Sequence, residues 1–545
     1  MSADATTDTS YLNAERGLWS WLTTTDHKRI ALLYLAGMMF FFTFAVLLAL
    51  TFRLHLFDPE AGVLAPVGAL LGLEDPGEIY NRLLTLHGVV MIFLFIIPGI
   101  PAVFGNFFLP ILIGAEDVSF PRLNLASWYF YVAGGILALV AVLGGGVDTG
   151  WTFYVPYSVN TDANVVVPML AAFVLGWSSI LTGLNFVTTV HRLRAKEMGW
   201  FQMPLFTWSL YATGWVQILA TPVVGITLIM VLMERYLGIP IFDPARGGDP
   251  VLYQHLFWIY SHPAVYIMIL PAMGVVSEII PTFSRKTIFG YKFIVFSSMA
   301  IAGIGSLVWA HHMFTAGMAD VARIVFSALT FLVAVPSAIK VFNWLATMYR
   351  GSVQLAPPML WALMFIFLFA IGGLTGLTVA SLSLDVHLHD TSYVVAHFHY
   401  TMFGGTGVIF IAGLHYWWPK IFGRMYNART ATVAAVLFFI GFNLTYIPLF
   451  IAGGLGMPRR YAFYVEEFAS LHQLSTVGSW VMAGSLLLAF GNLVWSLRRE
   501  TRAADDPWGG ATLEWRTATP PPVLNFHGAP DLSRGAYEYP VEVSA

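Results

Sequence analysis

The feature that most restricts the fold of this chain is a repeated apolar run, each run about 20 residues long. That is roughly the length a helix needs to cross the hydrocarbon core of a bilayer. Such windows lie near residues 30–52, 83–113, 125–147, 165–191, 205–236, 252–281, 290–312, 320–349, 357–381, 391–418, 429–453 and 474–498. The composition agrees, since 57% of the 545 residues are hydrophobic and 10% are charged. The sequence therefore predicts an all-α, polytopic membrane protein with twelve transmembrane helices.

The polar parts of the chain indicate its organisation and orientation. We expect a single membrane domain over residues 1–545, with an N-terminal segment at 1–29 and a charged, proline-containing tail at 499–545. With an inner N-terminus, most of the 27 lysines and arginines fall on the inner side, so both termini are expected inside. The start of the chain has no basic segment with a cleavage site, so we expect no removable signal peptide. No basic patch indicates nucleic-acid binding, and the net charge is −3.

Histidines are the unusual polar residues of these windows. Six of the 15 histidines lie well inside them, namely His87, His262, His311, His312, His397 and His399. A single intramembrane histidine could equally be a hydrogen-bonding residue in helix packing, but six, several of them clustered, indicate a metal or a cofactor. The chain has no cysteine, which excludes thiolate ligands, iron–sulfur clusters and covalently attached c-type haem.

The pair His311–His312 suggests a metal site. Neighbouring residues on a helix point about 100° apart, so both imidazoles can address one centre only if it lies against that face. His262 could supply a third imidazole. Three neutral imidazoles without a thiolate suit copper, zinc or iron. The structural alternative is an interhelical hydrogen-bonded pair.

The pair His397 and His399 suggests two cofactors. Residues two apart on a helix point about 200° apart, so these imidazoles cannot bind the same atom. Two cofactors on opposite sides of one helix, each with one axial imidazole, explain the spacing, and haem uses a proximal histidine in this way. His87 could be the second axial ligand of one of them.

These residues lie in segments that resemble subunit I of the haem–copper terminal oxidases, most closely the cytochrome c oxidase branch. In chain order the segments are "LTLHGVVMIF", "HPAVYIMILP", "WAHHMFTAGM", "VPSAIKVFNW", "LHDTSYVVAHFHY", "GMPRRY" and "PPPVLNF". The resemblance covers nearly the whole chain. It implies a respiratory oxidase that reduces O2 to water with electrons from cytochrome c and pumps protons. It also implies a location in the bacterial inner (cytoplasmic) membrane or an equivalent energy-transducing membrane.

The resemblance also implies a role for each candidate residue. His87 and His399 would bind a low-spin haem and His397 a high-spin haem, both of the A type in this branch; the copper ligands would be His262, His311 and His312. Tyr266 is four residues after His262 and shares its helix face; in the family this tyrosine is joined covalently to the histidine and supplies an electron and a proton for O–O cleavage. The other expected contacts are Arg53 at a haem formyl group, Trp151 and Trp258 beside the site, Arg459 and Arg460 at haem propionates, and His389 and Asp390, with Asp385 nearby, at an outer magnesium ion.

Two proton routes are expected on the same basis. Lys340 stands alone in an apolar helix, where a charge is costly unless it is functional. With Ser337 and Ser277 it resembles the family route that leads to Tyr266. Asp117 resembles the entrance of a second route, with Asn106, Asn124, Ser178 and Ser179 along it. From the residues alone, Asp117 could also be a solvated loop charge.

The stretch "YSHPAVY" at 260–266 departs from the commonest family pattern. Most relatives have His-Pro-Glu-Val-Tyr, and that glutamate ends the second route. Ala264 cannot carry a proton. Tyr260 is one turn before Ala264 and Ser261 adjoins it, as in a tyrosine–serine sub-branch of the family, and their hydroxyls with a water could replace the carboxylate. A tyrosine with a reference pKa of about 10, against about 4.3 for glutamate, would relay protons without storing charge.

Partners and alternatives follow from the same resemblance. Since the chain has no cysteine, the copper centre that accepts electrons from cytochrome c must lie on another chain, subunit II; subunit III, small subunits and membrane lipid are further expected partners. A quinol oxidase of the same fold is the main alternative, but quinol-oxidising relatives place an acid and a histidine where this chain has Leu48 and Ile79. A nitric oxide reductase would lack the tyrosine and the lysine. A secondary transporter would leave the histidine clusters unexplained.

Overall fold

The computed structural model describes residues 10–539, and over this range the chain forms helices and loops without a strand. Residues 1–9 of the predicted N-terminal segment and 540–545 of the predicted tail lie outside the described residues. Within the described part, eleven helical segments are long and apolar enough to cross a membrane. In chain order these are α2 (His27–Phe57), Pro76–Leu112, α6 (Pro121–Leu143), α8 (Val166–Arg192), α9 (Leu205–Leu237), α10 (Pro250–Ser284), α12 (Asp320–Met348), α13 (Pro357–Ala380), Ser392–Phe422, α17 (Ala428–Gly454) and Glu466–Ser496.

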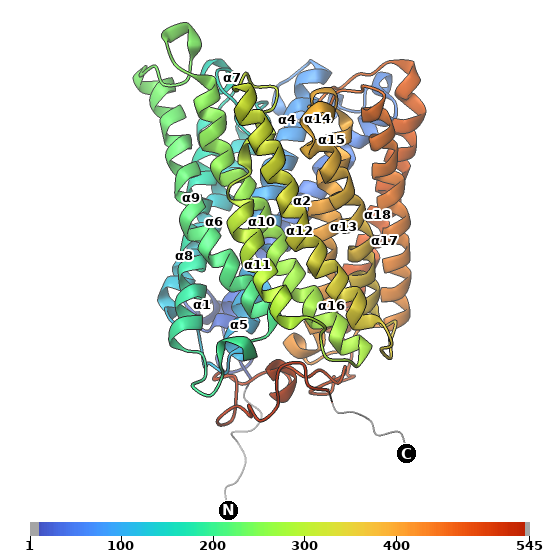
Figure 1. Ribbon diagram of the computed structural model, residues 1–545. Helices are drawn as coiled ribbons and strands as arrows, with labels where there is room; N and C mark the ends of the chain where they lie inside the picture. The colour runs from blue at the N-terminus through green and yellow to red at the C-terminus, as the bar shows by residue number, and fades with distance from the viewer. Residues whose placement is uncertain (1–9, 540–545) are drawn as a thin grey trace, which may run out of the picture.

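A further apolar helix, α11 (Tyr291–Gly305), has 15 residues. Each predicted window therefore contains one of these helices, and the predicted all-α membrane fold is confirmed. Figure 1 shows the long helices running side by side from one end of the molecule to the other, with short helices near the ends. The labelled short helices are α1 (Leu18–Leu22), α5 (Asn106–Leu112), α7 (Tyr157–Asn160) and α14 (Leu382–Leu388).

Two crossing segments change helix type partway along. Pro76–Leu112 consists of α4 (Pro76–Val89), the π-helical stretches η2 (Val90–Ile96) and η3 (Gly99–Gly105), and then α5. Ser392–Phe422 consists of α15 (Ser392–Thr401), the π-helical η7 (Met402–Gly407) and α16 (Val408–Phe422). The last segment joins a short 3-10 turn to α18 (Ala469–Ser496). π-Helical turns are rare and frequent at functional sites, and here η2 and η7 follow closely after His87 and His399.

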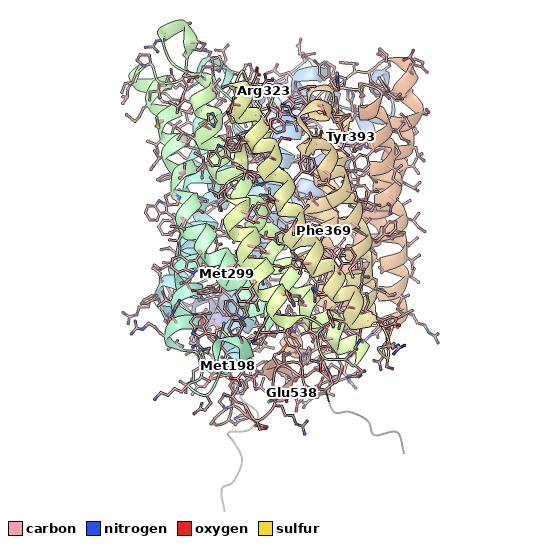
Figure 2. All side chains as sticks on the ribbon, in the orientation of Figure 1. Met198, Met299, Arg323, Phe369, Tyr393 and Glu538 are labelled. Carbon is pink, nitrogen blue, oxygen red and sulfur yellow. The ribbon has the colours of Figure 1, made fainter. Side chains whose placement is uncertain are left out.

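The stretch that follows α18 covers one end of the bundle (Figure 1). Asn525 donates hydrogen bonds to the carbonyl oxygens of Ala115 and Glu116, and Lys28 at the start of α2 donates to the carbonyl oxygen of Val523. The tail and the beginning of α2 therefore lie at the same end. Figure 2 places Met198 and Glu538 toward this end, Arg323 and Tyr393 toward the other, and Phe369 between them.

Helix α10 carries "YSHPAVY" and is the most enclosed of the crossing segments. Its start is well defined, because the Asp249 side chain accepts a hydrogen bond from the backbone N–H of Val251 and Pro250 occupies the first turn. Gly274 allows close contact with α9, since a β-carbon there would lie 2.9 Å from the Cα of Phe206. The helix thus sits in the interior of the bundle rather than on its lipid-facing surface.

One expected local feature is corrected by the structure. The helix predicted over 290–312 ends at Gly305, and His311 and His312 lie in the 3-10 helix η6 (Trp309–Met313). Glycines near the end of α11 weaken the helix, and the N–H of Ser306 bonds to the carbonyl oxygen of Gly303 instead of continuing the α pattern. Neighbouring residues of a 3-10 helix are about 120° apart around its axis, and the two ring centroids lie 4.3 Å apart. Arg53, expected at a haem formyl group, is buried one turn before the end of α2.

Gly453 offers a test of how α15 is positioned. A β-carbon at Gly453 would lie 1.9 Å from the backbone nitrogen of Tyr393, whereas one at the adjacent Gly454 would meet nothing within 4 Å. Gly453→Ala should therefore push α15 away from α17 and lower the thermal stability of the purified protein, at a cost of about 1–3 kcal/mol typical of overpacking. Gly454→Ala, the matched control, should be neutral or slightly stabilising, because alanine favours a helix. Equal melting temperatures for the two variants would contradict this packing.

Candidate functional site

All six intramembrane histidines line one internal cavity of about 840 Å³. This volume is near the upper end of the roughly 300–1,000 Å³ typical of ligand sites. The cavity extends from α2 and α4 across α10 to α12, α13, α15 and α18. It therefore brings together side chains that are more than 300 residues apart in the sequence, such as His87 and His399.

Three imidazoles meet on one side of the cavity. His262, His311 and His312 each offer a ring nitrogen, and these nitrogens lie within 4.8 Å of one another. Nδ1 of His262 is 3.1 Å from Nε2 of His312. Trp258 stacks on His312 with ring centroids 3.6 Å apart, and Nδ1 of His311 is 3.1 Å from the Thr330 hydroxyl. Such a cluster can hold one transition-metal ion through nitrogen alone.

Tyr266 lies beside this cluster. Its hydroxyl is 2.9 Å from Nε2 of His262, one turn away on α10. The ring fits because Gly305 at the end of α11 has no side chain, since a β-carbon there would lie 2.4 Å from the Tyr266 ring. The phenol is therefore held in hydrogen-bond contact with a candidate metal ligand.

His397 projects from α15 toward α13. Its Nδ1 is 3.1 Å from the hydroxyl of Thr375, which can donate its own proton to the carbonyl oxygen of Ile371. Gly376 leaves room for the ring, because a β-carbon there would lie 3.1 Å from Cε1 of His397. With Nδ1 occupied in this way, Nε2 is the nitrogen left for a ligand, a common arrangement for metal-bound histidines.

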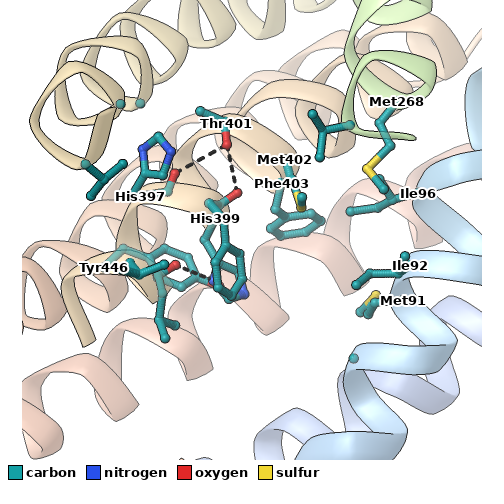
Figure 3. Close-up of a pocket in the computed structure, with 18 of the residues that line it drawn as sticks. Met91, Ile92, Ile96, Met268, His397, His399, Thr401, Met402, Phe403 and Tyr446 are labelled. Carbon is teal, nitrogen blue, oxygen red and sulfur yellow. Dashed lines mark hydrogen bonds between the residues drawn. The ribbon is translucent and has the colours of Figure 1, made fainter. Parts of the chain in front are cut away.

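His87 and His399 are held in the same manner. Nδ1 of His87 donates to the carbonyl oxygen of Ala45 at 2.9 Å, and Nδ1 of His399 donates to that of Val395 at 2.8 Å. His399 also stacks on Tyr446 of α17, with ring centroids 4.5 Å apart. Figure 3 shows the imidazoles of His397 and His399 leaving α15 in different directions. In both His87 and His399, Nε2 is therefore the ring nitrogen left for a ligand.

Trp151 and Arg53 form other parts of the cavity wall. Trp151 lies edge-on to Trp258, with ring centroids 5.8 Å apart, and packs closely over Gly88, next to His87. Arg53 is buried, and among residues 10–539 no hydrogen-bond partner faces its Nη2 atom. A buried guanidinium nitrogen without a partner is costly, so it is poised to donate to a group in the cavity.

The outer end of the cavity contains a cluster of charged residues. Nε of Arg459 is 2.7 Å from a carboxylate oxygen of Asp390, and Nδ1 of His389 is 3.3 Å from Asp385. Burial by itself would raise the pKa of Asp390, but the charges of Arg459 and His389 hold it below its ordinary value. Burial, together with the charge of Arg459, lowers the pKa of Arg460 to about 10, so the Arg460 guanidinium stays protonated at neutral pH.

Lys340 is buried in α12 and does not line the cavity. None of the ion pairs among residues 10–539 includes Lys340. Ser337, one turn earlier, does line the cavity. One turn after Lys340, Trp344 donates a hydrogen bond of 3.0 Å to the hydroxyl of Ser277 on α10. The lysine therefore lies between a polar contact on one side and the cavity on the other.

Asp117 does not line the large cavity; it lies in the loop between α5 and α6. Burial raises the pKa of Asp117 to about 7, an effect opposed by a hydrogen bond from the N–H of Val118 and by the charge of Lys28. It is therefore not a freely solvated loop charge.

The four polar residues expected near Asp117 are buried or half-buried. Asn106 donates to the carbonyl oxygen of Ala102, and both amide ends of Asn124 lack a partner within the described range. Ser178 bonds to the hydroxyl of Tyr34 at 2.9 Å. Ser178 and Ser179 line a second, much smaller cavity of about 20 Å³.

Tyr260, Ser261 and Ala264 all line the large cavity. Tyr260 is 3% exposed, and the Ser261 hydroxyl has no hydrogen-bond partner among residues 10–539. Both hydroxyls therefore border the same space as the metal-ligand candidates on α10.

Two buried residues were not identified from the sequence. His472 on α18 lines the large cavity, stacks on Tyr464, and has no partner for either ring nitrogen within the described residues. Gln217 on α9 lines the small cavity. The signal for each was a polar side chain at an apolar position, the same signal that identified Lys340.

Comparisons with known proteins agree with this geometry. A sequence profile of the family "Cytochrome C and Quinol oxidase polypeptide I" matches residues 29–481. Cytochrome c oxidase subunit 1 of Synechocystis sp. is 44% identical over 97% of this chain and 95% of that protein. The subunit of the same name from Bacillus sp. (strain PS3) is 42% identical over 95% of this chain and 83% of its own length.

A heme-copper terminal oxidase dimer determined by cryo-EM contains a chain of the same fold. Its TM-score is 0.71 at 21% sequence identity, over 87% of this chain and 85% of that one. The profile match over most of the chain and the full-length relatives lead to one conclusion. The chain is the catalytic subunit of a terminal oxidase and belongs to the Cytochrome C and Quinol oxidase polypeptide I family.

Proposed function

We propose that this subunit reduces O2 to water with electrons from cytochrome c and couples the reaction to proton pumping. The observation that supports this most directly is the convergence of six imidazoles, one buried and five half-buried, on one cavity of about 840 Å³. When bound, two haems and a copper ion would supply the electron-transfer and oxygen-reducing chemistry. The protein's own part is to hold these groups, exclude bulk water and deliver protons.

The residues that line the cavity fit such groups. His87 and His399 would hold a low-spin haem, His397 a high-spin haem, and the cluster of His262, His311 and His312 the copper. Three of these imidazoles have Nδ1 fixed by the protein and Nε2 free, which suits axial ligation. Arg53 provides an unpartnered donor at the cavity wall; we propose it for the formyl group of an A-type haem.

The outer cluster would serve two further roles. Arg459 and Arg460 carry two positive charges at one end of the cavity, suited to haem propionates. His389 and Asp390, with Asp385 hydrogen-bonded to the imidazole, offer a nitrogen and carboxylate oxygens for a magnesium ion. These residues would lie where the subunit meets subunit II in the assembled enzyme.

Cytochrome c is favoured over quinol as the electron donor by two apolar positions. Ile79 is 1% exposed in a hydrophobic cluster with Phe52 and Leu83, and Leu48 packs against the same cluster. Quinol-oxidising relatives would need an acid and a histidine there. Oxygen uptake with reduced cytochrome c, compared with uptake with a quinol, decides between the two donors.

The assembled enzyme would contain further chains. This chain has no cysteine, so a thiolate copper centre must be supplied by subunit II. Subunit III and small subunits are proposed as additional partners. The enzyme would lie in the bacterial inner membrane or an equivalent membrane, with both termini and the inner tail on the side from which protons are taken.

Proton delivery would use two routes. Lys340, Ser337 and the contact between Trp344 and Ser277 support a route toward Tyr266 along α12 and α10. Asp117 supports a second route, because a carboxyl with a pKa of about 7 can both take up and release a proton near neutral pH. In place of a carboxylate, Tyr260 and Ser261 would end that second route at the large cavity.

Substitution of the two histidines of α15 tests the cofactor assignment. The purified wild-type complex should contain two haems and one copper, measured by extracted-haem analysis, metal analysis and a reduced-minus-oxidised spectrum. His399→Ala should abolish the low-spin signal and His397→Ala the high-spin signal, because the two rings leave α15 in different directions. If both variants lose the same signal, the assignment is wrong.

Lys340→Met tests the first route. Methionine keeps the length of the side chain but cannot carry a proton, so steady-state oxygen consumption should fall at least about a hundredfold, within the range for loss of a proton-transfer group. Both haems should remain bound. The control is Lys292→Met, which removes an exposed lysine at the start of α11 and should leave turnover unchanged. Normal oxygen consumption by Lys340→Met would demote this lysine to a structural role.

Tyr260→Phe tests the second route. The change removes only the hydroxyl, so turnover and pumping should fall roughly tenfold while haem content stays normal. Tyr260→Phe combined with Ala264→Glu should recover a substantial part of the activity, because a carboxylate would then stand on the same helix face. Normal pumping by Tyr260→Phe would refute this role.

The entrance of that route has its own pH signature. Above pH 7 the carboxyl of Asp117 is increasingly ionised and holds fewer protons to pass on, so proton uptake should decline with a midpoint near its pKa of about 7. Asp117→Asn should slow uptake and remove this midpoint. An unchanged rate and pH profile in Asp117→Asn would show that protons enter elsewhere.

A further inference from the structure

The 3-10 helix η6 carries two of the three candidate copper ligands, and its own backbone gives it little support. It has five residues, and its N-cap residue is Val308, whose side chain cannot accept a hydrogen bond from the helix. The hydrogen bonds of a 3-10 helix are also poorer in geometry than those of an α-helix. Gly305 precedes the segment, and Gly317, with a φ of +85°, follows it. Contacts with neighbouring helices must therefore hold His311 and His312 in place.

One stripe of α10 lies next to η6. The four side chains of this stripe, which follow one another at intervals of three, four and four residues, are those of His255, Trp258, His262 and Tyr266. At about 100° per residue they fall within about 80° of arc around the helix. Trp258 stacks on His312, and His262 belongs to the imidazole cluster. The stripe therefore begins, one turn before Trp258, with a histidine that the copper assignment does not use.

His255 contacts η6 through Trp309. The indole N–H of Trp309 donates a hydrogen bond of 3.2 Å to Nδ1 of His255. An accepting Nδ1 leaves the proton of a neutral imidazole on Nε2, so this bond also fixes the tautomer of His255. The indole ring packs edge-on against Phe326 of α12 as well, with ring centroids 5.1 Å apart. Trp309 is thus held by both α10 and α12, the two long helices that contact η6.

The spacing of the contacts is the same on η6 and on α10. Side chains three residues apart in a 3-10 helix are eclipsed, so Trp309 and His312 share one face of η6. His255 and Trp258 are also three residues apart. Two reciprocal pairs result: a histidine of α10 accepts from a tryptophan of η6, and a tryptophan of α10 stacks on a histidine of η6. A stack alone leaves sliding within the ring plane free, whereas the added directional hydrogen bond fixes the register.

We propose that His255 is a positioning residue for the copper centre and acts through Trp309. By accepting the indole N–H, it holds η6 in register with α10, so that the imidazoles of His311 and His312 meet His262. Groups behind the ligands of a metal orient those ligands in this way. His255 does not line the large cavity, so its effect on the cluster passes through Trp309. The inference rests on the assignment of copper to this cluster in the proposed function.

His255→Leu in the intact, purified complex tests this role. Leucine cannot accept the indole N–H, so the reduced enzyme should lose copper to a copper(I) chelator about tenfold faster than the wild type, a typical effect for residues behind metal ligands. Trp309→Phe keeps an aromatic ring against Phe326 and removes the donor, so it should have the same effect. Metal analysis of copper per haem during the incubation gives the rates.

Two further variants separate positioning from packing. His255→Asn places an amide oxygen near the position of Nδ1 and should restore copper loss to near the wild-type rate. His255→Leu combined with Trp309→Phe should be no worse than either change alone, because both remove the same bond. The matched control is Tyr253→Phe, which removes a hydroxyl that donates to the carbonyl oxygen of Thr152 at 2.7 Å, about 200° around α10 from His255. It should lower the melting temperature without changing copper loss.

The outcomes separate this role from the copper assignment on which it rests. If His262→Ala loses copper while His255→Leu and Trp309→Phe retain it as the wild type does, the positioning role is overturned and the assignment stands. If His262→Ala keeps its copper, the assignment fails and the positioning role fails with it. A loss in His255→Leu that His255→Asn does not restore is a packing effect and also overturns the role. If His255→Leu does not assemble, Trp309→Phe and His255→Asn decide by the same measurement.

Discussion

The cost of leaving a polar atom without a partner in a low-dielectric interior governs this structure. An imidazole has two ring nitrogens, and each unsatisfied one costs about 1–3 kcal/mol when buried. At His87, His397 and His399 the protein satisfies one nitrogen, through a backbone carbonyl or the hydroxyl of Thr375. The other nitrogen remains on the cavity side. The bundle thereby sets the tautomer and orientation of each ring independently of any ligand.

The need to hold these rings in fixed orientations also accounts for the irregular backbone around the cavity. The phenol ring of Tyr266 and the imidazole of His397 need space, and glycines provide it: Gly305 beside Tyr266 and Gly376 beside His397. The π-helical stretches η2 and η7 follow closely after the turns that carry His87 and His399, where the helix presents a side chain to the cavity and then continues across the membrane. Regular α-helices cross the membrane, whereas the glycines and π-helical stretches shape the cavity.

The sequence was sufficient to predict the crossing helices, because the apolar windows depend only on composition over about 20 residues. It also predicted that His397 and His399 point away from each other, because that follows from the period of a helix. It failed at His311 and His312, where glycines end α11 before the histidines and a 3-10 turn replaces the α-helix. The partners of the ligand candidates, such as Thr375 and Tyr446, could not be predicted, since contacts between distant helices leave no pattern in a single sequence.

The tail that covers one end of the bundle has a consequence for biogenesis. Asn525 contacts His27 across 498 residues of sequence and also binds the carbonyl oxygens of Ala115 and Glu116, next to Asp117. The N-terminal parts of a chain leave the ribosome first, so α2 and the loop after α5 are made long before the segment that closes over them. The backbone beside Asp117 therefore acquires its cover from the tail only after all six imidazole-bearing turns have been synthesised.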